Sequence, residues 1–243
     1  MEDNKIKIPG ELALLVIVLI NSFGVVLMLY SGSGISAISS VPYAFSEIIP
    51  AVSLGTWTYI FQGILILSLF ILKRKFVTQY LLSFVVGFIF GECVDLHELW
   101  INILPENIYL RVIYFIISYI IISFGIALSN RCKMPIIPTD LFPREVSSIT
   151  GINYSKIKIP FDVICLGITA LTTFIFLHDI RGLGIGTVLA AFSMGKAISL
   201  IGIFLDKHFV FVRYINAGDI RNKLHQPCVK YNYKKEKSTK IYR

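Results

Sequence analysis

Charge is scarce in this sequence. Only 16% of the 243 residues are Asp, Glu, Lys or Arg, whereas soluble domains contain about 25%. Hydrophobic residues make up 55% of the chain, and the mean hydropathy is +0.73. The apolar residues also come in long runs, without the period of a half-buried helix or strand. These features exclude an ordinary soluble domain and predict an integral membrane protein.

Cysteine and histidine are scarce too, with four of each. No two cysteines form a CxxC pair and no histidines have metal-ligand spacing, so we expect free thiols and no metal. The sequence contains no HExxH, no GxSxG and no Walker phosphate loop. We therefore predict that the protein is not an enzyme and has no cofactor.

Positive charge is concentrated at the C-terminus. Residues 206–243 contain ten lysines and arginines and three acids, and so carry +7 of the net charge of +8. No nucleic-acid-binding motif accompanies them, so we expect a cytoplasmic tail beside anionic lipid and no nucleic-acid partner. The predicted organisation is a cytoplasmic N-terminus over 1–10, a transmembrane domain over 11–205 and the tail.

Six apolar runs are long enough to cross a bilayer, which takes about 20 residues. Lys and Arg gather after the second, fourth and sixth runs, which places these segments and both termini in the cytoplasm. We expect a multi-pass, all-α protein of the cell membrane. The predicted spans are 11–30, 53–72, 77–96, 110–129, 160–178 and 182–205.

The two halves of the chain resemble one another. Residues 20–27 match 121–128 through a shared Ile-x-Ser-Phe-Gly-x-x-Leu pattern, and Gly91 matches Gly195 at a shift of 104. Repeat A covers about 11–96 and repeat B about 110–205, with three spans each. An odd number of spans inverts the second repeat, and inverted repeats are a common signature of secondary transporters.

A short segment follows the first span of each repeat. Residues 31–50 contain two glycines, two prolines and six serines, and their counterpart is 131–148. We expect a short helix in each, over about 39–49 and 140–150, capped by Ser39 and Asp140. Each helix either lies flat at the membrane interface or dips inward and points its N-terminus at a cavity. The expected hinge or cap residues are Gly34, Pro42, Pro138 and Pro143.

Ionisable side chains within spans are candidates for function. Glu92 and Lys196 occupy equivalent positions in the two repeats, directly after the matched glycines, although Glu92 could reach water and Lys196 could snorkel. Asp162 at the start of the fifth span is a further candidate. The full set of predicted binding or path-lining residues is Ser36, Ser39, Ser40, Gln62, Glu92, Asp140, Arg144 and Lys196. Gly87, Gly91, Gly186 and Gly195 are expected to pack helices closely.

Three motifs together resemble a known family. They are Val41-Pro42-Tyr43 after the glycine–serine run, Pro135-x-x-Pro138-Thr139-Asp140, and Gly186-Thr187 with Gly195-Lys196. Over about residues 10–205 they are similar to the YczE/YyaS/YitT group of bacterial multi-pass membrane proteins. The resemblance implies a bacterial cytoplasmic membrane protein and supplies no established binding residues.

Two functions fit these observations. The first is a small secondary transporter or permease for a small polar or anionic solute, with Lys196 providing positive charge. The second is a non-transporting accessory protein that binds a membrane partner or forms a homodimer. A polar cavity between the short helices favours the first, and its absence favours the second.

Overall fold

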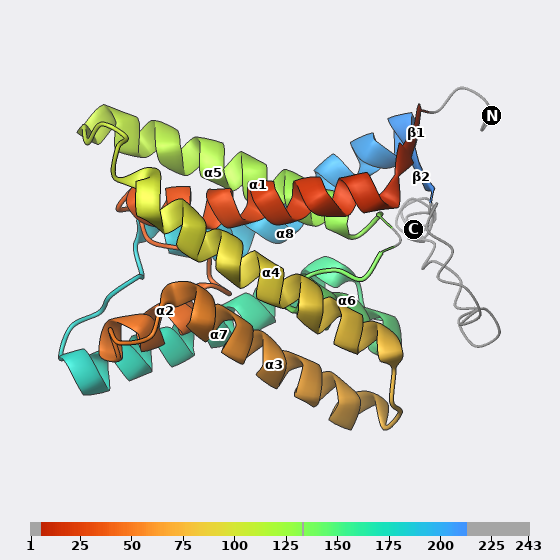
Figure 1. Ribbon diagram of the computed structural model, residues 1–243, viewed down its shortest axis with the longest axis horizontal. Helices are drawn as coiled ribbons and strands as arrows, with labels where there is room; N and C mark the ends of the chain where they lie inside the picture. Colours follow the sequence, from red (N-terminus) through yellow and green to blue (C-terminus); the bar gives the residue numbers. More distant parts are fainter. Residues whose placement is uncertain (1–5, 133, 213–243) are drawn as a thin grey trace, which may run out of the picture.

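Six long helices dominate the structure, a computed structural model that describes residues 6–132 and 134–212 (Figure 1). Each is long and apolar enough to span a membrane. This confirms the predicted all-α membrane protein with six spans. The six are α1 (Gly10–Tyr30), α3 (Leu54–Lys73), α4 (Thr78–Ile101), α5 (Ile108–Ser129), α7 (Tyr154–Leu177) and α8 (Ile185–His208).

Two short helices complete the helical part of the described chain: α2 (Ser40–Ile48) and α6 (Pro138–Thr150). Both pack against α3 and α7. Helix α2 lies at the end of the bundle that carries the α7–α8 turn, on the left of Figure 1. Helix α6 lies towards the opposite end, where Glu145 contacts Lys73 at the end of α3 and Tyr80 near the start of α4. Neither helix is long enough to cross a bilayer, as expected.

A two-stranded parallel sheet closes one end of the bundle. Strand β1 (Ile6–Pro9) pairs with β2 (Phe209–Val212), with Ile6 opposite Phe209. The sequence analysis missed both strands, although β-branched and aromatic residues dominate them. We call this end, on the right of Figure 1, the β-sheet end and the other the α2 end. Of the predicted tail, 206–243, the first residues belong to the end of α8 and to β2, and 213–243 lie outside the described residues, as do 1–5.

The greatest error in the predicted spans concerns α7. It begins at Tyr154, six residues before the predicted start, and continues through Pro160. The lysines at 156 and 158 had suggested a polar loop, but Lys158 is buried inside the helix. Helix α6 also begins earlier, at Pro138, so Asp140 lies in its first turn and is not its cap. Ser39 is at the cap position of α2 but makes no capping hydrogen bond.

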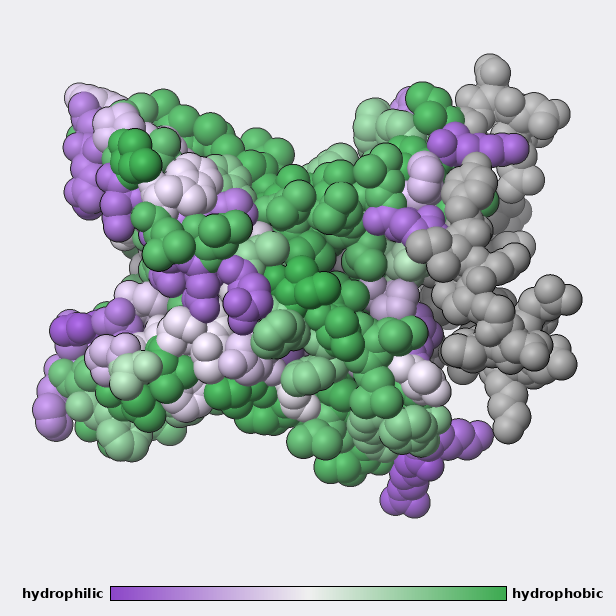
Figure 2. All heavy atoms as spheres, viewed as in Figure 1, coloured by the Kyte–Doolittle hydropathy of each residue, from purple (hydrophilic) through white to green (hydrophobic). Residues whose placement is uncertain are grey.

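The outer surface of the long helices is apolar. Large exposed aliphatic and aromatic side chains lie along all six, and Figure 2 shows green atoms across the middle of the molecule with purple atoms gathered mainly towards its two ends. This distribution suits a lipid environment around the middle and water at the ends.

The two halves share a sequence of elements, namely a long helix, a short helix and two long helices. Helix α1 packs against α4 as α5 packs against α8, and α1 also packs against α5. Arg74 ends α3 with a φ of 49°, and His178, 104 residues later, ends α7 with a φ of 53°. Left-handed conformations are uncommon outside glycine. Their recurrence at equivalent turns fits the predicted repeat, which itself stays a prediction.

Candidate functional site

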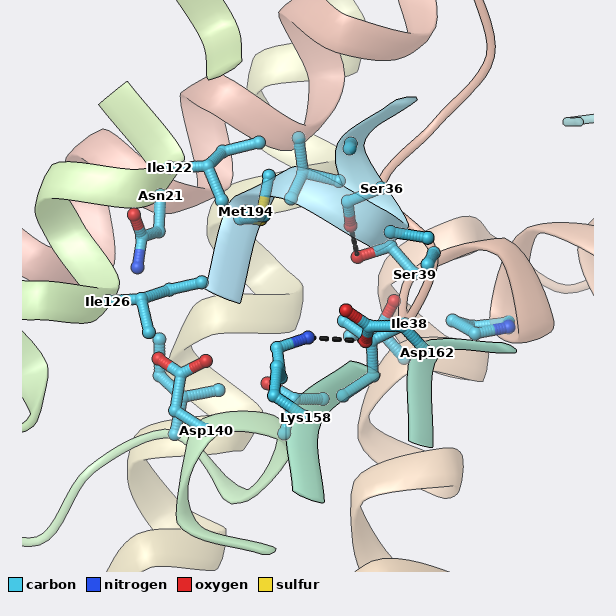
Figure 3. Close-up of a pocket in the computed structure, with 18 of the residues that line it drawn as sticks. Asn21, Ser36, Ile38, Ser39, Ile122, Ile126, Asp140, Lys158, Asp162 and Met194 are labelled. Carbon is cyan, nitrogen blue, oxygen red and sulfur yellow. Dashed lines mark hydrogen bonds and ion pairs between the residues drawn. The ribbon is translucent and has the colours of Figure 1, made fainter. Parts of the chain in front are cut away.

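A small cavity lies between the two short helices and the centre of the bundle (Figure 3). Its volume is about 30 Å³, room for about one or two water molecules. Most of its wall is apolar, including Ile122, Ile126 and Met194. Its polar groups come from the segment before α2, the first turn of α6, and helices α1, α3 and α7. They are Asn21, Ser36, Ser39, Thr58, Thr139, Asp140, Lys158 and Asp162.

Lys158 and Asp162 form a buried ion pair in the cavity wall. They are one helical turn apart on α7, and each side chain is only 2% exposed. Lys158 Nζ donates a hydrogen bond to Asp162 Oδ1. Removing two charges from water costs several kcal/mol each, so such a pair is weak evidence for stability and stronger evidence for a function.

Asp140 brings a second carboxylate to the same cavity. It lies in the first turn of α6 and is 5% exposed. Its Oδ2 atom has no hydrogen-bond partner within the described part of the chain. Burial raises the pKa of Asp140 to about 6, against the opposing effects of Lys158 and Arg144. The cavity therefore holds two carboxylates and one amine.

The α2 side of the cavity is polar but uncharged. Ser36 Oγ donates to Ser39 Oγ at 2.9 Å in the turn before α2. Ser40 Oγ lies 2.8 Å from Thr169 Oγ1 of α7, and both residues are fully buried. Hydroxyl groups thus line or flank this side without the desolvation cost of a charge.

Ion pairs close the bundle on both sides of the cavity, and they differ in burial. Near the β-sheet end, Glu145 Oε2 of α6 accepts hydrogen bonds from Lys73 Nζ at 2.8 Å and Tyr80 OH at 2.6 Å. At the α2 end, Arg181 Nη1 donates to Glu47 Oε2 of α2 at 2.9 Å. The Lys73 and Glu145 side chains are 20% and 16% exposed, against 50% and 28% for Arg181 and Glu47.

The segment before α2 is held against the start of α8 through its backbone. Ile35 N donates to Gly182 O at 3.1 Å, and Gly186 N donates to Ser33 O at 3.0 Å. Gly34 has a φ of 101°, and a Cβ atom there would lie 2.0 Å from Thr187 Oγ1. The glycines of the 182–186 run thus permit this close approach. At Gly186 an added Cβ atom would meet Phe115 of α5 at 2.4 Å, in line with the helix packing expected there.

The other predicted packing glycines lie in different surroundings. A Cβ atom at Gly87 would meet Gln62 Oε1 at 1.8 Å and Pro138 Cδ at 2.8 Å, and one at Gly91 would meet Gly55 O at 2.7 Å. These two positions bring α4 close to α3 and α6. At Gly195 the nearest neighbour of an added Cβ would be Ser155, at an ordinary 3.7 Å.

The structure places most of the predicted polar residues at or near the cavity and two of them away from it. Ser36, Ser39 and Asp140 line the cavity, and Ser40 lies beside it. Gln62 is fully buried next to Gly87 with both amide atoms unpartnered within the described chain, and Arg144 acts on Asp140 electrostatically. Glu92 and Lys196 do not reach the cavity, because both lie on exposed faces of α4 and α8.

Among the hinge residues, Pro42 lies in the first turn of α2 and lines the cavity. Pro138 is the first residue of α6, where a missing N–H costs nothing. Pro143 lies inside α6 and is buried.

Sequence analysis missed Lys158 and Asn21 as cavity residues. Lys158 was counted among the loop lysines that set the orientation. Its spacing of four residues from Asp162 is the signal that could have identified it, since such residues share a helix face. Asn21 lies within the repeated Ile-x-Ser pattern, but at a position that the pattern leaves open. Among the described residues, no group of three His, Cys, Asp or Glu could hold a metal ion.

Comparison with known protein families shows which family this chain belongs to. A family of unknown function, DUF6198, matches residues 8–202, which include the six long helices almost entirely. The chain belongs to this family. No curated protein and no solved structure matches it. Membership in this family is compatible with the resemblance to the YczE/YyaS/YitT group and does not establish it.

Proposed function

We propose that this DUF6198 protein is a small secondary transporter that carries a small polar solute through the cavity between α2 and α6. The observation that carries the proposal is the buried Lys158–Asp162 pair with Asp140 beside it, enclosed within a membrane-spanning bundle. Ionisable groups inside membrane bundles mark solute and ion pathways by default. The element order of the two halves adds support, because transporter sites commonly lie where such halves meet.

The charges around the cavity indicate the class of solute. Two carboxylates face one lysine there, and Lys196, which was expected to attract an anion, is on the exposed face of α8. Among the residues that line the cavity, this excess of one acid favours a neutral or cationic solute over an anionic one.

The two ion-pair closures supply a route for alternating access. A cavity of about 30 Å³ holds only water-sized species, so a solute enters after one side opens. Separation of Arg181 from Glu47 would free α2, and separation of Lys73 from Glu145 would free α6. The Arg181–Glu47 pair is the more exposed of the two, so it opens at lower cost than the Lys73–Glu145 pair.

Solute binding and flux test the proposal. Purified protein is first screened for thermal stabilisation by small amino acids, amines and polyols, since a ligand raises the melting temperature by binding the folded state. A stabilising compound is then followed into proteoliposomes. We expect Asp140→Asn to reduce flux at least tenfold and Glu92→Gln, a carboxylate outside the cavity, to leave it unchanged. Equal flux in the two variants would contradict the proposal.

The exposed charges of α4 and α8 favour a second candidate, a partner-binding accessory protein. Lys196 lies near the middle of α8 on its exposed face, and Glu92 is exposed on α4. A charge facing hydrocarbon is costly, so a membrane partner or second copy would stabilise both. Site-specific cross-linking from position 196 in native membranes tests this candidate, and labelling of lipid alone would contradict it.

We infer further that the β-sheet end faces the cytoplasm. The α3–α4 turn at this end contains Lys73, Arg74 and Lys75, and short loops rich in Lys and Arg stay on the cytoplasmic side. A single cysteine at position 75 should resist an impermeant thiol reagent in intact cells, whereas one at position 180 should react. The reverse pattern would contradict the orientation.

A further inference from the structure

We propose that Asp140 is a reversible proton-binding site that shares Lys158 with Asp162. The proposal deepens the transport function, on which it rests for its purpose, by naming the proton as the coupling ion. Figure 3 shows Asp140 and Asp162 on either side of Lys158, with the lysine amine directed to Asp162.

The first argument is the number of charges. Lys158 neutralises one carboxylate, and it is paired with Asp162. Asp140 is then a buried carboxylate with one oxygen unpartnered among the described residues. An unpaired carboxylate out of water is neutralised most readily by taking up a proton. Protonation of Asp140 makes the three-residue cluster neutral.

The second argument is that the proton can leave again. Asp140 lies in the first turn of α6, where the positive end of the helix dipole favours negative charge. Lys158 from α7, the Ser129 hydroxyl group of α5 and Arg144 from α6 also favour the ionised form. Burial raises the pKa of Asp140 and these groups limit the rise, to about 6. The carboxyl group is therefore poised to gain and lose a proton near physiological pH.

The other elements around the cavity contribute no further charge. The described cavity residues from α1, α2, α3, α4, α5 and α8 are all neutral, and Asp162 and Lys158 are the titratable ones from α7. Cys132, in the segment before α6, is coupled to Asp140, but its thiol stays neutral because burial raises its pKa. Titration of Asp140 thus depends on three charged neighbours, Lys158, Asp162 and Arg144, and on the neutral Ser129 hydroxyl.

The three groups form an exchange device. When Asp140 is protonated, Lys158 pairs with Asp162. When the proton leaves Asp140 for water, the new carboxylate competes for the lysine amine and weakens its hold on Asp162. Because Asp162 and Asp140 belong to α7 and α6, proton release changes how these helices attract one another.

Infrared titration of the protein in lipid nanodiscs tests this proposal with the proton itself as the probe. The carboxyl C=O band of a protonated acid is recorded from about pH 4 to about pH 8, a range that brackets a buried carboxyl group of raised pKa. We expect a band that titrates near pH 6 and is lost in Asp140→Asn. Lys158→Gln should raise its midpoint by about one pH unit or more, and Asp162→Asn should lower it, because the lysine then pairs with Asp140. Glu106→Gln, an exposed acid, is the control.

A stability measurement guards against variants that fold poorly. A carboxyl group whose pKa is higher in the folded state binds more protons there, so its contribution to stability falls as pH rises from about 4 to about 6. Asp140→Asn removes this contribution. The melting temperature of the variant relative to the wild type should therefore rise between about pH 4 and about pH 6 and stay constant at higher pH. Absence of an Asp140-dependent band, or a midpoint that ignores Lys158→Gln and Asp162→Asn, would overturn the proposal. An Asp140 titration without any solute flux would retain the proton site and reject transport.

Discussion

Helices α2 and α6 occupy corresponding places in the two halves of the chain, and both pack against α3 and α7. They differ in how they are held. Helix α2 meets α7 through a neutral pair, Ser40 with Thr169, and it meets the α7–α8 turn through the more exposed Glu47–Arg181 ion pair. Helix α6 carries Asp140 into the cavity and is held by the more buried Glu145–Lys73 pair.

This difference gives the two sides of the cavity separate roles. The α2 side offers hydroxyl groups and a weak closure, which suits a side that opens readily and orients a solute. The α6 side offers ionisable groups and a strong closure, which suits a side whose opening depends on proton binding. The comparison predicts a graded series of effects, largest where buried charge is disturbed.

The largest effect is expected at the charged side. Lys158→Met leaves Asp162 buried without its cation, which should destabilise the protein by about 3–5 kcal/mol. Lys158→Met combined with Asp162→Met removes both charges and should recover most of that loss. Thermal unfolding in detergent measures both variants. A double variant as unstable as the single one would show that the pair itself holds α7 in place.

The backbone contact beside α2 should give the next largest effect. Gly34→Ala combines a strained φ of 101° with a Cβ atom 2.0 Å from Thr187 Oγ1, which should cost about 3 kcal/mol or more. Gly151→Ala, at the end of α6, is the matched control, because its φ is 70° and no atom lies within 4 Å of an added Cβ. It should cost about 1 kcal/mol. Equal melting temperatures of the two variants would mean that the backbone before α2 shifts to accommodate the added methyl group.

The two ion-pair closures should differ when each is broken. Glu145→Gln removes the charge that holds Lys73 and Tyr80, which should cost about 2 kcal/mol. Glu47→Gln breaks the more exposed pair and should cost less than about 1 kcal/mol. The fully buried Cys132, next to α6 in the chain, provides a local readout. In a chain with Cys132 as its only cysteine, Glu145→Gln should speed alkylation and Glu47→Gln should not.

Sequence was a good guide to the spans and a poor guide to the cavity, for physical reasons. Hydrophobic length alone defines a spanning helix, so all six were predicted. Burial of Lys158 could not be read from hydropathy, because a lysine lowers the score whether or not a partner four residues away neutralises it. Ser39 and Asp140 were predicted because residues of these types commonly cap helix starts. Ser36 was predicted because a hydroxyl group can face a cavity without the cost of a buried charge. Glu92 and Lys196 were singled out by position in their spans, which does not reveal which face of a helix is exposed.

The smallest effect tests the neutral side alone. Ser40→Ala leaves Thr169 Oγ1 without its partner on α2 at 2.8 Å in a fully buried place, which should cost about 1 kcal/mol. Ser46→Ala on the same helix is the control, because Ser46 Oγ donates only to Tyr43 O one turn earlier. If Ser40 also orients the solute, flux should fall further than the melting temperature implies, whereas Ser46→Ala should change neither. Because α2 contributes no charge to the cavity, the pH midpoint of Asp140 should be the same in both variants. A shifted midpoint in Ser40→Ala would mean that the α2 side and the α6 side of the cavity are coupled through α7.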